Sequence, residues 1–152
     1  MNVAEFMQEA IAEARIALEE GETPVGCVIA RKGEIVARAH NQREALHDPT
    51  AHAEILAIQI AAKNVNDWRL NDCTLYVTLE PCPMCAGAIS QARIGRLLYG
   101  ARDEKQGCAG SVYRIPEDPA FSHFCPSDGG LLEAECRAPL IEFFKHKRIH
   151  NA

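Results

Sequence analysis

The sequence predicts an α/β domain in which helices pack on the faces of a central sheet. Apolar, β-rich segments alternate along the chain with segments of helical periodicity, a pattern typical of layered α/β proteins. The length of 152 residues fits one folding unit with its own core, so we expect a single domain over residues 1–152. No internal repeat, linker or low-complexity segment divides the chain.

The first part of the chain predicts a helix followed by a β-hairpin. Apolar residues recur at helical spacing from about Val3 to Glu20, and Gly21 follows as a natural helix end. Residues 25–31 and 34–40 predict two antiparallel strands joined by a turn at Lys32-Gly33.

A polar loop then leads into a second helix. We expect this helix over about residues 51–63, with Asp48 or Thr50 as its N-cap. Its sequence is apolar nearly all round, which predicts heavy burial.

The remaining elements are expected in a strand, helix, strand order before a closing helix. Residues 74–79 predict a strand, residues 83–92 a helix that opens on a proline, and residues 96–100 another strand. Glycines and prolines interrupt the next segment, where residues 121–125 could form a short fifth strand. A last helix is expected over about residues 131–147.

The composition argues against a membrane-spanning or a secreted protein. The chain is 47% hydrophobic and 24% charged, and no apolar run approaches the roughly 20 residues needed to cross a bilayer. The N-terminus lacks the basic and apolar regions of a signal peptide. Seven cysteines are an odd number, so a complete disulfide framework is impossible. We therefore expect a cytoplasmic protein in a reducing compartment.

The net charge is negative, but the closing residues are basic. A formal net charge of −5 argues against a general nucleic-acid binder, because phosphate affinity comes largely from lysine and arginine. Residues 143–150, in contrast, combine two phenylalanines with Lys145, Lys147 and Arg148. A local patch of this kind can hold a phosphate backbone on an acidic protein.

Two short motifs indicate the chemistry. His52-Ala53-Glu54 stands near the start of the second helix, and Pro81-Cys82-Pro83-Met84-Cys85 leads from a strand into the third. The two cysteines are three residues apart at a helix N-terminus, which turns both sulfurs to one side and favours thiolate. One histidine and two cysteines supply three zinc ligands, and a catalytic zinc site keeps its fourth position for water. We therefore predict a catalytic Zn²⁺, with Glu54 as the base that moves the protons of that water.

Each motif alone has ordinary explanations. A Cys-x-x-Cys pair also occurs as a redox pair or as half of a structural zinc knuckle, and a histidine on a buried helix is more often a core residue. The knuckle needs a fourth ligand, and none stands at the usual spacing. His52 and Glu54 would not share a face of an ideal helix, although at the first turn both can border one cavity. Their combination, H-x-E with P-C-x-x-C, is the signature of the zinc nucleobase deaminases.

Longer blocks of sequence resemble the bacterial tRNA-specific adenosine deaminase family. The resemblance covers roughly residues 10–148. Its main blocks are Pro24-Val25-Gly26, Asn41, residues 47–55, residues 75–82, residues 84–89, residues 99–103, and the closing Phe143-Phe144-Lys145 with Arg148. The zinc motifs are shared by the whole superfamily, whereas residues 48–54, residues 101–111 and the C-terminus favour the tRNA branch.

The resemblance implies a three-layer α/β/α cytidine-deaminase-like fold with a central mixed five-stranded sheet flanked by helices. It also implies a homodimer with one Zn²⁺ per subunit that converts adenosine to inosine at the wobble position of an arginine tRNA anticodon. His52, Cys82 and Cys85 match the family's zinc ligands, and Glu54 matches its proton shuttle.

The resemblance also implies substrate-binding residues. Asn41 matches a residue that hydrogen-bonds the flipped base, Val25 matches a pocket wall, and Ala53 is expected beside them. Asp103 matches a loop acid near the anticodon backbone, where a carboxylate could accept from a ribose 2′-OH. Its alternative is a solvated loop acid.

The basic tail has two interpretations. Lys145, Lys147 and Arg148 could hold phosphates while Phe144 packs on a ribose or base. Alternatively, the phenylalanines belong to the core and the charges are merely solvated. Cys108 replaces a small residue of the family pattern, and residues 115–127 match it poorly.

Two other functions stay open at the level of sequence. A free-base or nucleoside deaminase, acting on guanine or cytosine, would share the zinc site, and the net acidity of the chain favours it. Such an enzyme would not need a phosphate-binding tail. The third function is a zinc-stabilised scaffold that binds nucleic acid without catalysis, for which Glu54 would be dispensable.

Overall fold

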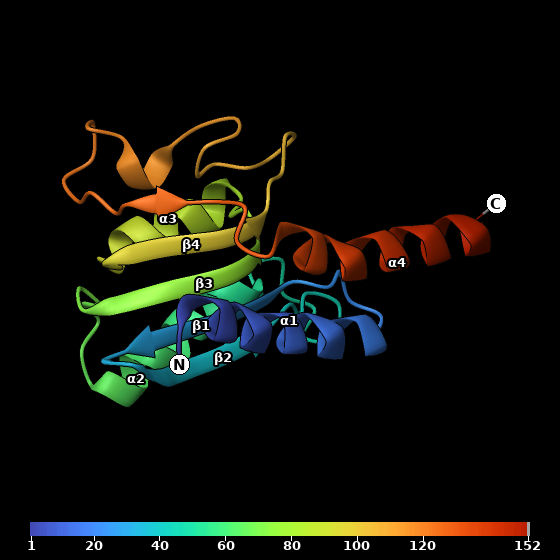
Figure 1. The fold of residues 1–152 in the computed structure, drawn as a ribbon, viewed down its shortest axis with the longest axis horizontal. Helices are drawn as coiled ribbons and strands as arrows, with labels where there is room; N and C mark the ends of the chain where they lie inside the picture. Colours follow the sequence, from blue (N-terminus) through green and yellow to red (C-terminus); the bar gives the residue numbers. More distant parts are fainter. Residues whose placement is uncertain (152) are drawn as a thin grey trace.

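Within residues 1–151, which the computed structural model describes, five strands form one mixed sheet and four α-helices cover its two faces (Figure 1). In spatial order the strands are β2 (Glu34–His40), β1 (Gly26–Arg31), β3 (Cys73–Leu79), β4 (Arg96–Ala101) and β5 (Ser127–Asp128). The helices are α1 (Val3–Glu19), α2 (Ala53–Val65), α3 (Pro83–Gln91) and α4 (Glu133–Asn151), with a 3₁₀ turn η1 (Ile115–Glu117). The α/β fold with a mixed five-stranded sheet is confirmed. Ala152, the last residue of the expected domain, lies outside the described residues.

The sheet combines an antiparallel half with a parallel half. β1 pairs antiparallel with β2 and with β3, while β4 pairs parallel with β3 and with β5. Lys32 and Gly33 join β1 to β2 with φ angles of +53° and +79°, the left-handed pair that a tight hairpin turn requires. The predicted hairpin is therefore confirmed.

The helices bury the sheet from both sides. Alternate residues of β1 point to opposite faces, so Cys27 and Ile29 join the cluster under α2 and α3, and Val28 and Ala30 join the cluster under α1 and α4. Because both faces are covered, β1 is buried along almost its whole length. The last turns of α4 project beyond the sheet (Figure 1). In the described part of the chain, no helix has the length and apolar character needed to span a membrane.

The start of α2 differs from the prediction. The carboxylate of Asp48 accepts hydrogen bonds from the backbone N–H and the hydroxyl of Thr50, at 2.8 and 2.7 Å, which closes a separate local turn. Neither residue caps the helix, and the N-cap is His52. α2 is also buried on one face only, with Ile60 40% exposed on the other.

The prediction of a fifth strand at residues 121–125 is wrong, because that segment forms other contacts. The backbone N–H of Cys125 donates to the carbonyl of Pro116 at 2.8 Å, and the His123 ring lies 2.7 Å from the carbonyl of Ile94. The strand that pairs with β4 is the two-residue β5, opposite Leu97 and Leu98.

Candidate active site

Three metal-ligating side chains meet where α2 and α3 begin. His52 is the N-cap of α2, Cys82 is the N-cap of α3, and Cys85 lies in the first turn of α3. The Nδ1 atom of His52 lies 3.6 Å from the sulfur of Cys82 and 3.5 Å from that of Cys85. Tetrahedral zinc, with bonds of about 2.3 Å to sulfur and 2.0 Å to nitrogen, would set such atoms about 3.5 Å apart. The donor atoms therefore fit one tetrahedral metal ion, with all of them within 4.8 Å of one another.

The two sulfurs differ in their affinity for protons. The hydrogen bond from the Cys85 thiol lowers the pKa of Cys82 to about 4, although burial opposes this shift. The same hydrogen bond, together with burial, raises the pKa of Cys85. The pair thus holds one thiolate and one thiol. A divalent cation would displace the remaining proton, because metal binding requires both sulfurs as thiolates.

Glu54 lies beside the metal-ligating group in a buried position. It belongs to the first turn of α2, is 4% exposed, and lines the same pocket as His52 and Cys82. Burial raises the pKa of Glu54 to about 7, which suits a group that accepts and returns protons near neutral pH. His52 has an extended backbone (φ −75°, ψ 153°), so its side chain does not follow helical spacing. This is why two residues only two positions apart can border one cavity.

A pocket of about 120 Å³ opens over this group. Seven of the predicted site residues line it, namely Val25, Asn41, His52, Ala53, Glu54, Cys82 and Asp103. The prediction missed five further lining residues, Thr23, Arg43, Leu79, Glu80 and Gln106. Glu80 had a usable signal, since it is a carboxylate placed between a buried strand and the Pro-Cys motif.

Asn41 lines the pocket and retains hydrogen-bonding capacity. It is 7% exposed, its Nδ2 donates to the carbonyl of Thr23 at 3.1 Å, and its Oδ1 accepts from the N–H of Arg43 at 3.1 Å. An amide side chain has two donors and two acceptor positions. One of each is left for a ligand, and the loop fixes the direction of both.

A buried carboxylate holds the loop that carries Arg43. Glu22 is 2% exposed and accepts from the backbone N–H groups of Glu44 and Ala45, at 3.0 and 2.8 Å. This wall of the pocket is therefore fixed by hydrogen bonds to the main chain.

The predicted tail residues lie on different sides of α4. Phe144 and Arg148 line a groove of about 830 Å³ together with Asp103 and Gln106, which also line the pocket. Lys147 lines a separate groove of about 730 Å³ with Phe143, its Nζ 5.8 Å from the centre of that ring.

Lys145 is exposed and belongs to the lining of neither groove in the described part of the chain. The structure thus places Phe144 and Arg148, rather than the whole tail, next to the pocket.

Known proteins resemble this chain in sequence and in fold. Residues 1–117 match the family described as MafB19-like deaminase. A tRNA-specific adenosine deaminase of Bacillus subtilis (strain 168) is 48% identical over 143 residues, which cover 94% of this chain and 89% of that protein.

Two solved structures extend the comparison. One comes from a study of A-to-I editing by tRNA:A34 deaminases at the wobble position of transfer RNA. It matches this chain with a TM-score of 0.86 and 46% sequence identity, and the match covers 90% of this chain and 99% of that chain. The other is a guanine deaminase of Bacillus subtilis, with a TM-score of 0.65 and 42% identity over 67% of this chain and 66% of that chain.

Proposed function

The chain belongs to the tRNA-specific adenosine deaminase family, and on that premise we propose that it hydrolyses the wobble adenosine of a tRNA anticodon to inosine. Water replaces the exocyclic amine of the base, and ammonia leaves. The observation that carries this proposal is the group of His52, Cys82 and Cys85, of which His52 and Cys82 line a pocket that also contains the buried carboxylate of Glu54.

We propose that the metal is one Zn²⁺ per subunit. Sulfur and imidazole ligands at these separations suit zinc, and three protein ligands are the number found in catalytic sites. When bound, zinc supplies a water whose pKa falls from 15.7 to about 7.

Glu54 would carry the protons. Its carboxylate takes a proton from the attacking water, delivers it to the purine ring nitrogen, and later protonates the departing amine. The position of Glu54, buried and bordering the same pocket as two of the ligands, supports this role.

The remaining pocket residues would bind the nucleotide. The free donor and acceptor of Asn41 suit the edge of a flipped base, with Val25 and Ala53 as walls. Asp103 stands where the pocket meets the groove along α4, in reach of a sugar.

The α4 groove would receive the nucleotides that flank the wobble base. Phe144 offers a stacking surface there, and Arg148 offers a charge for phosphate. Lys145 and Lys147 would add to the positive field of the helix without lining the same groove.

The proposal also covers the extent of the domain, the oligomeric state, the tRNA substrate and the cellular compartment. We infer a single zinc-dependent deaminase domain over residues 1–152 that acts as a homodimer on an arginine tRNA in the cytoplasm. None of the seven cysteines forms a disulfide in the structure, as is usual for a reducing compartment.

The test is inosine formation in an anticodon stem-loop. Zinc-loaded protein is incubated with an arginine stem-loop that carries adenosine at the wobble position, and inosine is read as guanosine by reverse transcription. The same stem-loop with adenosine moved one nucleotide away is the control. We expect inosine at the wobble position alone. Release of xanthine from guanine with no inosine in RNA would instead identify a guanine deaminase.

A further inference from the structure

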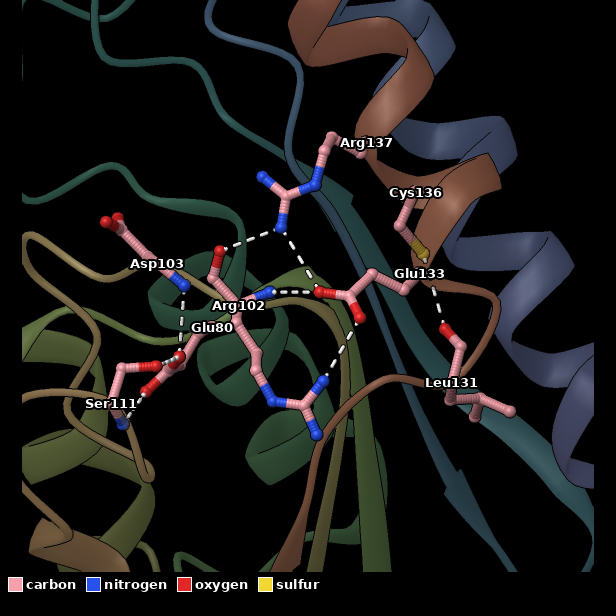
Figure 2. Close-up of polar contacts among 8 residues, drawn as sticks. All are labelled: Glu80, Arg102, Asp103, Ser111, Leu131, Glu133, Cys136 and Arg137. Carbon is pink, nitrogen blue, oxygen red and sulfur yellow. Dashed lines mark hydrogen bonds and ion pairs between the residues drawn. The ribbon is translucent and has the colours of Figure 1, made fainter.

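A second buried carboxylate lies at the pocket, and neither the metal-ligating group nor the proton transfer uses it. Glu80 directly follows β3 and is 2% exposed. Its Oε1 accepts from the backbone N–H of Asp103 at 3.0 Å and from the hydroxyl of Ser111 at 2.5 Å. Its Oε2 accepts from the N–H groups of Ala109 and Ser111, at 3.2 and 2.9 Å. Figure 2 shows Glu80 between Asp103 and Ser111.

One carboxylate therefore ties together both ends of a single loop, residues 103–111. A carboxylate has about four acceptor positions, and donors from this loop use that number. The middle of the loop also lies against it, because a Cβ at Gly107 would collide with the carboxyl group of Glu80 and with the carbonyl oxygen of Asp103. The loop wraps around Glu80 and has no room for a side chain at residue 107.

The start of the loop is held from its other side as well. Glu133, in the first turn of α4, accepts from the N–H of Arg102 at 3.1 Å and pairs with its guanidinium at 3.1 Å. Arg137 donates to the carbonyl of Arg102 at 3.1 Å (Figure 2). The peptide that joins residue 102 to residue 103 is thus fixed between β3 and α4.

The 103–111 loop carries pocket residues. Asp103 and Gln106 line both the pocket and the α4 groove. The Asp103 carboxylate accepts from the N–H of Gln106 at 3.1 Å, so its direction follows the loop backbone. Any change in the hold on the loop would therefore move both side chains relative to Glu54.

We propose that Glu80 is a positioning residue for the RNA substrate. It fixes the 103–111 loop in the position from which Asp103 and Gln106 contact the nucleotides beside the reacting base. This inference rests on the proposed function for its substrate. The hydrogen bonds by which Glu80 holds the loop do not depend on which substrate the protein binds.

The test variant is Glu80→Gln, which keeps the size of the side chain but turns an NH₂ group toward backbone N–H donors. We expect faster amide hydrogen exchange across residues 103–111 and a KM for the stem-loop raised roughly 10-fold to 100-fold, the scale of a misplaced binding group. The value of kcat should change little, because the lost contact serves binding rather than chemistry. Zinc stoichiometry should stay at that of the wild type.

Two further variants sharpen the result. Asp118→Asn is the control. Asp118 lies away from the pocket and its carboxylate accepts from the N–H of Ala120 at 2.8 Å, so this variant should leave KM and the amide exchange of residues 103–111 unchanged.

Gly107→Ala disturbs the same contact as Glu80→Gln. The increase in KM of the double variant should therefore be smaller than the product of the increases in the two single variants. If Glu80→Gln does not fold, Ser111→Ala removes part of the contact and should act in the same direction.

Unchanged exchange of the loop in Glu80→Gln would overturn the inference, as would zinc loss that accounts for the whole effect. A wild type that forms no inosine would overturn the function and the RNA role while the exchange result still decides whether Glu80 holds the loop.

Discussion

At the scale of single residues, the pocket contains two glutamates with opposite protonation behaviour. Burial raises the pKa of Glu54 to about 7. Burial also acts on Glu80, but hydrogen bonds from Ser111, Asp103 and Ala109 outweigh it and lower the pKa of that carboxyl. When the environments of two carboxyl groups shift their pKa values in opposite directions, the two groups commonly have different roles. This difference agrees with the proposed roles, in which Glu54 transfers protons and Glu80 holds the 103–111 loop.

Replacing Glu54 with glutamine should remove catalysis and leave the protein otherwise intact. The amide keeps the size of the side chain but cannot take a proton from water, so kcat for inosine formation should fall by about 10²–10⁴-fold. Bound zinc and the melting temperature should match those of the wild type, since Glu54 is not among the three ligands.

Glu34→Gln, on an exposed strand position, is the matched control and should retain full activity. Wild-type turnover in Glu54→Gln would mean that another group moves the proton.

At the scale of secondary structure, strong local patterns predicted most of the elements, and the errors come from one competing local turn and from contacts between segments distant in sequence. The hairpin of β1 and β2 follows from strand periodicity and a two-residue turn, and α3 follows from a proline at its first position. The start of α2 depends on a competing turn at Asp48, and β5 depends on a main-chain partner that is distant in sequence.

The candidate active site was more predictable than the loops around it. Ligand spacing predicted the three residues that the fold brings within reach of one metal ion, because metal binding demands those residue types. Glu22 could not be predicted, since a carboxylate that accepts from backbone N–H groups has no local sequence pattern. For Glu80 the sequence shows its place between a strand and the Pro-Cys motif but not the distant loop that donates to it.

The division of side chains around α4 leads to a prediction within one helix. Arg148 and Phe144 line the groove that shares Asp103 with the pocket, whereas Lys145 does not. Arg148→Ala should weaken stem-loop binding and lower the slope of log K against log salt by about 1, the loss of one phosphate contact.

Lys145→Ala removes the same formal charge from the same helix and should have the smaller effect on both quantities. Titrations at several salt concentrations measure them. Equal losses in the two variants would show that the helix acts through its total charge and that the groove has no special part.

At the scale of the whole molecule, one end of the sheet collects every part of the pocket. Val25 precedes β1, Asn41 follows β2, Glu80 follows β3, and Asp103 lies just beyond β4. Because β1 runs antiparallel to β2 and β3, and β4 runs parallel to β3, these four positions lie at the same end of the sheet. α2 and α3 lie on the same face of the sheet, and their N-termini deliver His52 and the two cysteines there. A metal at this point would join the N-termini of two helices, which otherwise meet through packing and through the contacts of His52 with the two cysteine sulfurs.

Zinc removal should therefore lower the stability of the fold as a whole. A ligand present at 1,000 times its dissociation constant stabilises the native state by about 4.1 kcal/mol, and each kcal/mol is worth about 2–4 °C for a chain of this size. We expect chelation to lower the melting temperature by roughly 10 °C and zinc to restore it.

Two cysteine variants separate this effect from ordinary loss of packing. Cys82→Ser should melt near the chelated wild type, bind no zinc and show no response to chelator, because it lacks a ligand. Cys125→Ala removes a buried sulfur elsewhere in the core, so it should melt lower than the wild type but keep the full shift on chelation. Calorimetry with and without chelator measures all three proteins. If chelation left the wild-type transition in place, the metal would not couple the two helices, and the stability of this end of the sheet would come from packing alone.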